Sequence, residues 1–294
     1  MLKYTLITCI CLSTLAAHTQ NITVPPGGMH LDTFYRKYID AGGIPVISSS
    51  NVSDSALFTA RSIITYMLEK RPDIRHELIK TDARLSIIGK DEMQTDLPEC
   101  RDWKKPEKDD PRLTNWERDN YDKPGGIASM TDKQYWDQRA RGMGGIQTSC
   151  AEENLLGIPG TRYYGENITV HEFSHNMMAA LVAIDPKVYD TLEKAYNAAL
   201  KKGLYPDQYA INTIDEYWAE GTQWWFWSNF EFYDGATRVQ TPDDLKAYDP
   251  ALYAILEKVY PGHHIPADVY YGKNLNSPVQ KTPDAPVHRN RRRN

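Results

Sequence analysis

Hydrophobic and polar positions divide the chain into a strand-forming first half and a mainly helical second half. Residues 44–48 and 84–89 are short apolar runs of the kind that form buried strands. Between them, residues 55–70 repeat apolar side chains at helical spacing, and one face of this predicted helix carries Leu57, Ala60, Ile63, Ile64 and Met67. The strand–helix–strand order predicts a small sheet in this half of the chain.

Beyond Cys150, apolar residues recur at helical spacing over most of the chain. The pattern predicts helices around residues 171–175 and over residues 186–202, 212–232 and 242–259. Pro186 and Pro242 stand where proline favours the first turn of a helix. After Pro261 the chain is rich in Pro, Gly and Asn, which predicts a return strand and a frayed terminus. We find no internal repeat.

Two glycine- or proline-rich segments lie between these halves. Residues 91–126 are rich in Asp, Lys, Pro and Trp without a clear period, which predicts a long surface loop of the kind that borders a cleft. Residues 142–145 contain three glycines but lack the Lys-Ser/Thr pair that completes a phosphate-binding loop. We therefore expect a flexible turn without a catalytic role at residues 142–145.

Composition indicates a globular protein outside the nucleic-acid-binding classes. The 294 residues are 41% hydrophobic and 25% charged, which is enough apolar material for a sizeable core. The net charge of −5 argues against a nucleic-acid partner. Lys3, the apolar run after it and the small residues that follow are typical of a secretory signal peptide. No later run is long and apolar enough to span a membrane, so we expect a secreted, extracellular protein without a transmembrane segment.

These patterns predict an α+β fold with a small N-terminal sheet and a mainly helical C-terminal lobe. We expect a signal peptide over residues 1–17 and an α/β lobe over residues 21–150. A helical lobe over residues 151–275 would carry the chemistry described below. Residues 276–294 are expected to form a disordered basic tail.

Cysteines and glycosylation sequons agree with secretion. Two cysteines leave with the predicted signal peptide, so Cys100 and Cys150 remain, and in an oxidising compartment we expect them to form a disulfide. Two buried free thiols are the alternative. Three N-glycosylation sequons are present, at Asn21, Asn51 and Asn167. A glycan on the third would crowd the motif that begins four residues later.

His171-Glu172-Phe173-Ser174-His175 is the H-E-x-x-H pattern, in which a helix presents two imidazoles to one metal ion. Residues four apart share a helical face, so both imidazoles can converge on a cation, and the arrangement suits zinc. The apolar residues 177–182 indicate a largely buried helix, where unpaired polar groups are costly. An exposed turn with two solvated histidines is the alternative.

A catalytic zinc ion needs a third protein ligand and an open position for water. The metzincin pattern is excluded, because Met178 and Leu181 stand where it requires glycine and histidine. Glu216 and Glu220 lie four apart on a strongly apolar predicted helix, and one of the two is the candidate ligand. For Glu216 the alternative is a capping box with Thr213, three residues earlier.

The H-E-F-S-H motif, Tyr209 and the run Glu216-Tyr-Trp-Ala-Glu220 together resemble the catalytic domain of the anthrax lethal factor type of gluzincin metallopeptidase. The resemblance covers roughly residues 169–225, about a fifth of the chain. It implies a zincin-like fold. It also implies these roles: zinc ligands His171, His175 and Glu216, general base Glu172, oxyanion stabiliser Tyr209, and Glu220 as a carboxylate behind the ligands.

The sequence therefore predicts a secreted zinc metallopeptidase with Zn²⁺ as cofactor and a peptide or protein as substrate. Glu172 would take the proton of a zinc-activated water and return it to the leaving amine. Glu220 or Asp215 would accept a hydrogen bond from a ligating imidazole. His263 and His264 are second-choice donors to the oxyanion. The alternative function is a catalytically silent extracellular-matrix protein, mineral-associated in one version, that retains a zincin fold.

Overall fold

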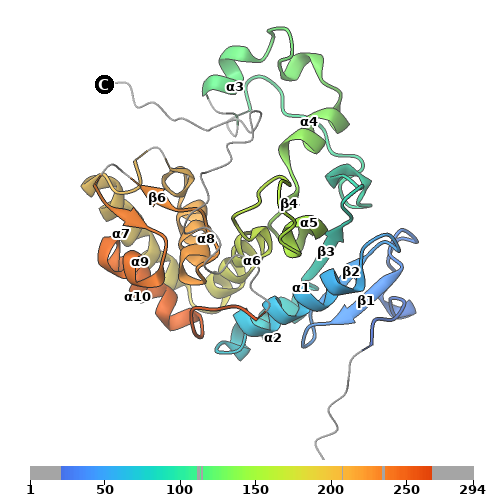
Figure 1. Ribbon diagram of the computed structural model, residues 1–294, viewed down its shortest axis with the longest axis horizontal. Helices are drawn as coiled ribbons and strands as arrows, with labels where there is room; N and C mark the ends of the chain where they lie inside the picture. Colours follow the sequence, from blue (N-terminus) through green and yellow to red (C-terminus); the bar gives the residue numbers. More distant parts are fainter. Residues whose placement is uncertain (1–20, 111–112, 114, 207, 234–235, 267–294) are drawn as a thin grey trace, which may run out of the picture.

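A mixed five-stranded sheet packs against a set of helices, which confirms the predicted α+β class (Figure 1). The computed structural model describes residues 21–266 apart from 111–112, 114, 207 and 234–235. The strands are β1 (Lys37–Asp40), β2 (Pro45–Ser48), β3 (Arg84–Ile88), β4 (Gly142–Met143), β5 (Gln147–Ala151), β6 (Phe232–Tyr233) and β7 (Arg238–Val239). The main sheet has the order β1-β2-β3-β5-β4, and β6 pairs with β7 separately. Its three central strands run parallel, and each edge strand is antiparallel to its neighbour.

Helices make up most of the remaining described structure. The α-helices are α1 (Asp54–Met67), α2 (Pro72–Lys80), α3 (Asn115–Asn120), α4 (Asp132–Arg139), α5 (Glu152–Leu155), α6 (Ile168–Ile184), α7 (Pro186–Lys202), α8 (Ile214–Trp225), α9 (Pro242–Tyr248) and α10 (Pro250–Val259). Short 3-10 turns are η1 (Gly27–Met29), η2 (Gln94–Asp96), η3 (Ile127–Ser129) and η4 (Tyr209–Ile211). Among the described helices, none is long and apolar enough to cross a membrane.

The first strand–helix–strand unit forms as predicted. The Ser53 side chain caps α1 by accepting the backbone N–H of Ala56 at 3.4 Å. All five apolar residues of the predicted face of α1 are buried. Together, α1 and α2 carry the chain from β2 to its parallel neighbour β3, the kind of crossover that parallel strands require. The sequence pattern did not predict β1, α2 or β5.

The disulfide predicted between Cys100 and Cys150 is wrong, because the two thiols are free and lie on opposite faces of the sheet. Cys150 belongs to the main core cluster, beside its strand partner Ile87. Cys100 packs in a smaller cluster on the other face, where Gln94 donates hydrogen bonds to Cys100 Sγ at 3.2 Å and to Ser149 Oγ at 3.1 Å. Successive side chains of a strand point to opposite faces, so Cys150 points away from Ser149 and Cys100.

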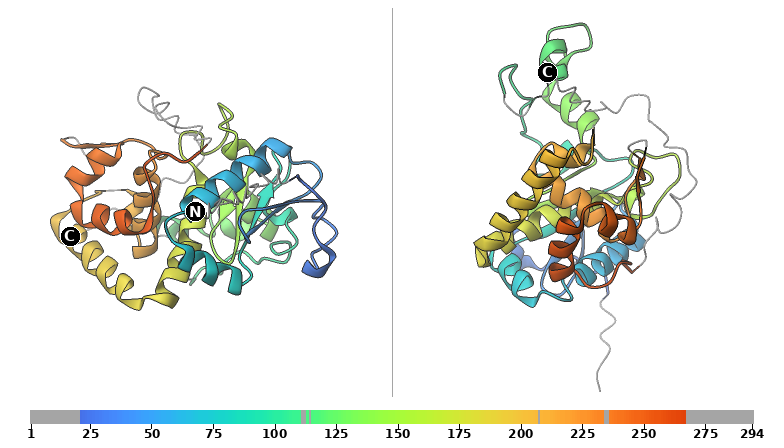
Figure 2. Two further views of the ribbon diagram at one scale, coloured as in Figure 1. Left: turned by 90° about the horizontal axis from the view of Figure 1, so that it is seen from below. Right: turned by 90° about the vertical axis from the view of Figure 1, so that its left-hand side faces the viewer.

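Helix α6, which carries the metal-binding motif, lies between the sheet and the helices of the C-terminal half (Figures 1 and 2). It contacts β4 and β5 on one side and α7 and α8 on the other. Asn167 caps its first turn, accepting the N–H of Val170 at 3.2 Å. Asp185 ends α6 and caps α7, because proline at position 186 cannot continue the first helix and is preorganised to begin the second.

Two predicted helices have different bounds in the structure. The helix predicted over residues 212–232 ends at Trp225 in α8, and the chain reverses through Trp227, whose φ is 53°. The helix predicted over residues 242–259 is two helices, α9 and α10, separated at Asp249. Asp249 precedes Pro250, which disfavours the helical conformation at the residue before it. Most of the chain after Pro261, where a return strand is predicted, lies outside the described residues, which end at residue 266.

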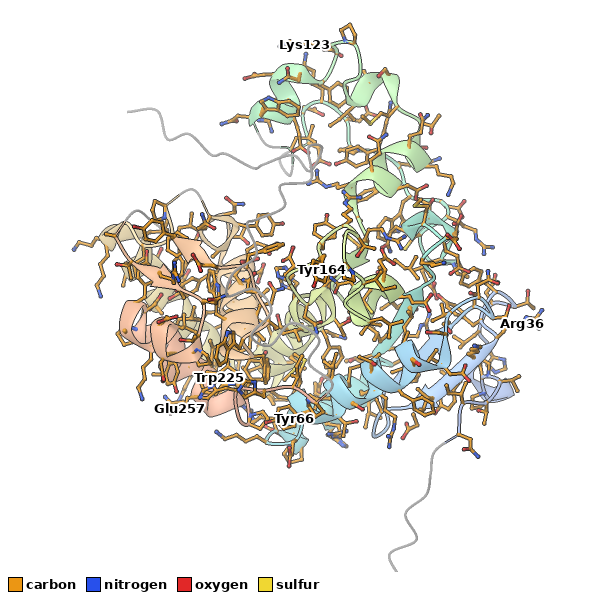
Figure 3. The ribbon with its side chains drawn as sticks, in the orientation of Figure 1. Arg36, Tyr66, Lys123, Tyr164, Trp225 and Glu257 are labelled. Carbon is orange, nitrogen blue, oxygen red and sulfur yellow. The ribbon has the colours of Figure 1, made fainter. Side chains whose placement is uncertain are left out.

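The loop predicted over residues 91–126 contains more structure than expected. Together with α4 it forms a segment that projects from the rest of the molecule, with Lys123 near its tip (Figures 2 and 3). The turn η2 and helix α3 lie within the predicted loop, and the turn η3 follows directly after it. A small apolar cluster of its own holds the segment together: Leu113, Tyr121, Ile127 and Tyr135. Its base leads through α4 to β4.

One continuous hydrophobic cluster extends from the sheet through α6 to α10, across the predicted lobe boundary at residue 150. At the far end of α8, Tyr66 from α1 lies 6.3 Å from the Phe226 ring, and Trp225 Nε1 donates to the carbonyl of Gly262 at 3.2 Å (Figure 3). The contact between Tyr66 and Phe226 joins the N-terminal and C-terminal halves of the chain. The predicted signal peptide, residues 1–17, and the predicted tail, residues 276–294, lie outside the described residues.

The three predicted glycosylation sites differ in exposure. Asn21 and Asn51 are exposed. Asn167 is fully buried as the cap of α6, and its side-chain nitrogen has no hydrogen-bond partner among the described residues. A glycan on that nitrogen would have to displace the packed core, so the prediction of a glycosylated Asn167 is wrong for the folded protein.

Candidate metal centre

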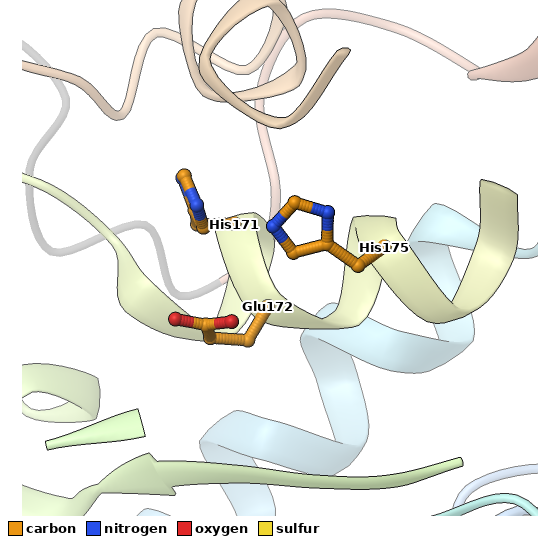
Figure 4. A group of neighbouring side chains, drawn as sticks. All are labelled: His171, Glu172 and His175. Carbon is orange, nitrogen blue, oxygen red and sulfur yellow. The ribbon is translucent and has the colours of Figure 1, made fainter. Parts of the chain in front are cut away.

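Helix α6 presents His171, Glu172 and His175 together (Figure 4). Each of the three offers one potential ligand atom, and these atoms all lie within 4.8 Å of one another. The two imidazole rings lie along one side of the helix, with centroids 5.0 Å apart and planes inclined by 76°. The four-residue spacing of the histidines produces this arrangement, since residues i and i+4 share a helical face.

Helix α8 brings Glu216 to both imidazoles. Its Oε2 lies 3.0 Å from Nε2 of His171 and 3.8 Å from Nε2 of His175. Ligand atoms about 2.0–2.1 Å from a tetrahedral zinc ion lie about 3.3 Å from one another. The two distances bracket that value, so the spacing of the Glu216 oxygen from each ring nitrogen fits two ligands of one small cation.

The capping alternative for Glu216 is only half realised. Thr213 Oγ1 accepts the backbone N–H of Glu216 at 3.1 Å, which caps α8. A full capping box would also require the glutamate side chain to return to the backbone N–H of Thr213. The carboxylate instead turns toward His171. The cap thus fixes the backbone of Glu216, while the Glu216 side chain points into the cleft toward His171.

Gln223, which the sequence analysis missed, fixes the orientation of His171. Its side-chain nitrogen faces two acceptors, the Asn167 carbonyl at 3.1 Å and Glu166 Oε2 at 3.4 Å. Its side-chain oxygen therefore faces Nδ1 of His171, 2.9 Å away, and must accept a hydrogen bond from that nitrogen. Gln223 is fully buried and lies seven residues, two helical turns, after Glu216, so helical periodicity could have indicated it.

This hydrogen bond leaves a cation-binding position between His171 and Glu216. With Nδ1 donating to Gln223, a neutral His171 has its lone pair on Nε2, aimed at a carboxylate oxygen 3.0 Å away. Two acceptors at that separation repel unless a cation, either a proton or a metal ion, lies between them. The donor set of two imidazoles and one carboxylate matches that of many catalytic zinc sites.

Burial and crowding shift the pKa values of these groups. Burial opposes protonation of His171, but its hydrogen bond with Glu216 and the nearby carboxylates raise its pKa well above the ordinary value. Burial lowers the pKa of His175 to about 4, so this imidazole is neutral and able to bind a metal at physiological pH. Burial raises the pKa of Glu172 to about 7, in the range suited to a general base.

The glycine segment at residues 142–145, expected to be a flexible turn without a catalytic role, is a turn only in its second half. Gly142 and Met143 form the edge strand β4, which contacts α6, and Gly144 and Gly145 lie in the connection from β4 to β5. A Cβ on Gly142 would lie 2.5 Å from a methyl carbon of Ile168, and one on Gly144 would lie 3.0 Å from two side-chain carbons of His175. The backbone N–H of Gly144 also donates to the Glu172 carboxylate. Small residues here allow the strand to approach the motif.

Tyr209, in η4, completes the group that the sequence singled out. Its ring centroid lies 6.3 Å from that of His171, and its hydroxyl hydrogen-bonds the Glu216 carboxylate. Tyr209 and Glu220 line the same cleft of about 500 Å³ as the three motif residues and Glu216. The structure thus brings together all six residues predicted for the site.

Other candidates named from the sequence are placed differently. Glu220 Oε1 lies 3.6 Å from Nδ1 of His171, while its Oε2 accepts a hydrogen bond from Asn229 at 2.8 Å. Asp215 is exposed and does not line the cleft. His263 packs on Trp225, with ring centroids 4.3 Å apart, outside the residues that line the cleft. The second-choice pair at 263 and 264 therefore cannot act on a substrate bound at the motif.

Glu166 is a further acidic residue of the cleft that sequence reasoning did not assign. It lies one residue before the cap of α6 and approaches Gln223 and Glu220. Burial, together with the charge of Glu220, raises the pKa of Glu166 to about 8. Four glutamates and two histidines thus share one cleft, a concentration of negative charge that a divalent cation would offset.

Comparisons with known proteins do not assign the chain to a family. No protein-family model matches the chain, and no curated protein matches it. The functional interpretation therefore depends on the geometry of the site and on the motif residues.

Proposed function

We propose that the protein is a zinc-dependent metallopeptidase of zincin-like fold. The observation that carries the proposal is the position of Glu216 Oε2, within 3.0 and 3.8 Å of the Nε2 atoms of His171 and His175. Three side chains separated by up to 45 residues in sequence converge there with the donor set of a catalytic zinc site. A structural zinc site would ordinarily close its fourth position with a further protein ligand, often cysteine.

In this proposal, His171, His175 and Glu216 hold the metal. Both imidazoles can act through Nε2: Gln223 keeps the proton of His171 on Nδ1, and the low pKa of His175 keeps its ring neutral. Zinc bound by such a set supplies Lewis acidity, which activates water and polarises a substrate carbonyl. Glu220 and Asn229 support the ligands from behind.

The remaining residues of the site perform the proton transfers and position the substrate. Glu172, with its pKa raised to about 7, takes the proton from the attacking water and passes it to the leaving amine. The Gly144 N–H holds the Glu172 carboxylate in place. Tyr209 donates its hydroxyl proton to a hydrogen bond with the oxyanion, exchanging the Glu216 carboxylate for substrate. Hydrolysis of a peptide bond follows from these roles.

Peptide hydrolysis can be tested with a mixed peptide library and detection of new termini by mass spectrometry. Zinc-loaded protein is expected to cleave a subset of the peptides, chelation is expected to stop cleavage, and added zinc is expected to restore it. A chelated, metal-free preparation that retains full activity would overturn the assignment. Cleavage of no peptide by protein that binds one zinc per chain would favour the catalytically silent matrix protein.

We also propose that the protein is secreted, with matrix association as a property of the silent alternative. The support is the signal-like sequence of residues 1–17 and the exposed sequons at Asn21 and Asn51. Cys100 and Cys150 do not support secretion, because they form no disulfide. Expression in a secreting eukaryotic cell tests it: the protein should appear in the medium, lacking the predicted signal peptide. Retention of the intact N-terminus inside the cell would refute secretion.

A further inference from the structure

Three arginines line the cleft beside the candidate metal centre: Arg139 at the end of α4, Arg141 just before β4, and Arg162 in the loop before α6. Arginines in a cleft otherwise dominated by glutamates divide it into two zones of opposite charge. Whether the basic zone can attract a ligand depends on how many of these guanidinium groups are already neutralised.

Two of the three are paired with carboxylates of the protein. Arg141 is buried and binds both oxygens of Glu153, at 2.9 and 2.8 Å. This bidentate pair satisfies its charge and ties the start of β4 to helix α5. Arg139 donates to Glu117, which is itself buried, and lies over the ring of Tyr135. Both arginines hold the projecting segment and the edge strand in place.

Arg162 is different, because it contacts only uncharged groups. Its guanidinium donates to the backbone carbonyls of Asp137, at 3.4 Å, and Gln138, both in the last turn of α4. It also lies 5.1 Å above the ring of Tyr163. Within the described part of the chain, no carboxylate lies within ion-pair distance of it. These contacts fix the guanidinium at the cleft and leave a full positive charge and further N–H donors unused.

The charge pattern determines what can bind beside Arg162. The four glutamates of the cleft, Glu166, Glu172, Glu216 and Glu220, come from α6, α8 and the loop before α6, and they repel an anionic group placed near them. A carboxylate reaching Arg162 would instead meet a preorganised fork of N–H donors, the geometry that carboxylates prefer. A lysine or arginine side chain at the same point would meet a like charge.

We propose that Arg162 is a specificity-determining residue that binds a carboxylate of the substrate, so that preferred peptides are acidic near the scissile bond. The inference rests on the proposed peptidase function. The carboxylate can come from an Asp or Glu side chain or from the C-terminus of a short peptide. Both sources offer the same bidentate acceptor.

Matched peptides test the proposal on the wild-type protein. One series replaces Glu by Gln at each position on either side of the cleaved bond, and a second compares free and amidated C-termini. A hydrogen-bonded ion pair predicts a kcat/KM about tenfold higher for the acidic member at one position, decreasing with added salt. Preference within the first series identifies a side-chain carboxylate, and preference confined to the second identifies the C-terminus. No acidic preference in either series would overturn the proposal.

Substitutions at Arg162 test whether this residue causes the preference for acidic peptides. Arg162→Gln should reduce the acidic-to-neutral ratio of kcat/KM about tenfold, and Arg162→Lys should retain part of it because the charge remains. Arg101→Gln, which removes a half-exposed arginine paired with Asp32 outside the cleft lining, should leave the ratio unchanged. An acidic preference that persists in a folded Arg162→Gln protein, checked by thermal melting, would contradict the assignment.

A peptide-binding assay distinguishes failure of the Arg162 carboxylate site from failure of the proposed peptidase function. Fluorescein-labelled Ala-rich peptides that differ in one Glu or Gln are titrated into zinc-loaded Glu172→Gln protein, with and without Arg162→Gln. Arg162-dependent binding of the Glu peptide without any hydrolysis by wild-type protein supports the carboxylate site and refutes peptidase function. Hydrolysis with equal binding and cleavage of the Glu and Gln peptides supports peptidase function and refutes the carboxylate site.

Discussion

Replacing Gln223 with alanine removes the hydrogen bond that holds the His171 proton on Nδ1. In the wild-type protein this bond is 2.9 Å long and fully buried, and it keeps the proton of neutral His171 on Nδ1, so that Nε2 is the ring atom that binds either a further proton or a metal ion opposite Glu216. Without it, His171 can carry its proton on Nε2, stabilised by the Glu216 carboxylate 3.0 Å away. A metal ion must then displace that proton and reorient the ring.

The magnitude follows from the type of contact that is lost. Removing a partner that orients a metal-binding histidine typically lowers metal affinity by about 10–100-fold, or about 1.4–2.7 kcal/mol. The same change removes the hydrogen bond from the Gln223 amide to the Asn167 carbonyl, which still accepts the backbone N–H of His171, so the cost in folding stability is that of one buried hydrogen bond, about 0.5–1.5 kcal/mol. Zinc affinity and the stability of the metal-free protein should therefore both fall, by separable amounts.

Competition with a chromophoric zinc chelator measures the affinity, and thermal unfolding with chelator present measures the stability. Gln240→Ala is a matched control, because Gln240 is buried outside the cleft and neither of its amide atoms has a hydrogen-bond partner among the described residues. It should leave zinc affinity unchanged. Zinc binding by a folded Gln223→Ala protein within about twofold of wild type, well below the expected loss, would refute the role assigned to this hydrogen bond.

Further predictions concern the carboxylates and the edge strand. Glu216→Ala should abolish stoichiometric zinc binding, whereas Glu220→Ala should weaken it about tenfold, and equal effects in the chelator competition would contradict the assigned roles. Gly144→Ala should reduce activity and lower the melting temperature, because its Cβ would lie 3.0 Å from carbons of the second imidazole of the motif; unchanged melting and activity would show that the strand can move aside. In the metal-free protein, Glu166 and Glu172 have pKa values raised to about 8 and about 7. Over this range the folded protein holds protons that the unfolded chain has already released, so stability decreases with rising pH until the folded-state groups ionise. The melting temperature should therefore fall between about pH 6.5 and pH 8 and should not rise.

Sequence patterns predicted the elements that depend on local spacing. Helix α6 and its two histidines follow from an i, i+4 pattern in an apolar run, and the start of α7 follows from Pro186. The carboxylates of α8 follow from the same logic, since Glu216 and Glu220 share a helical face. Periodicity alone could not show which of the two glutamates lies against both imidazoles. In the structure it is Glu216, whose Oε2 lies 3.0 Å from Nε2 of His171 and 3.8 Å from Nε2 of His175.

Features that depend on pairing between distant segments were not predictable in the same way. Strand β5 pairs in parallel with β3, which lies about sixty residues earlier in the sequence. Residues Gln147–Ala151 of β5 lack the alternating apolar pattern that would predict a strand. The face on which Cys150 lies depends on that register, so the disulfide could not be judged from the two cysteines alone. The role of Gly144 likewise arises only where β4 meets α6.

Turnover by the Glu172→Gln protein tests the central claim most directly. The substitution keeps the shape of the side chain and removes its ability to accept a proton, while His171, His175 and Glu216 remain to bind the metal. The account predicts about one zinc per chain in both proteins, with peptide hydrolysis by the wild type and a loss of at least about a hundredfold in the variant. A zinc-loaded Glu172→Gln protein that hydrolyses the same peptides at the wild-type rate would contradict it.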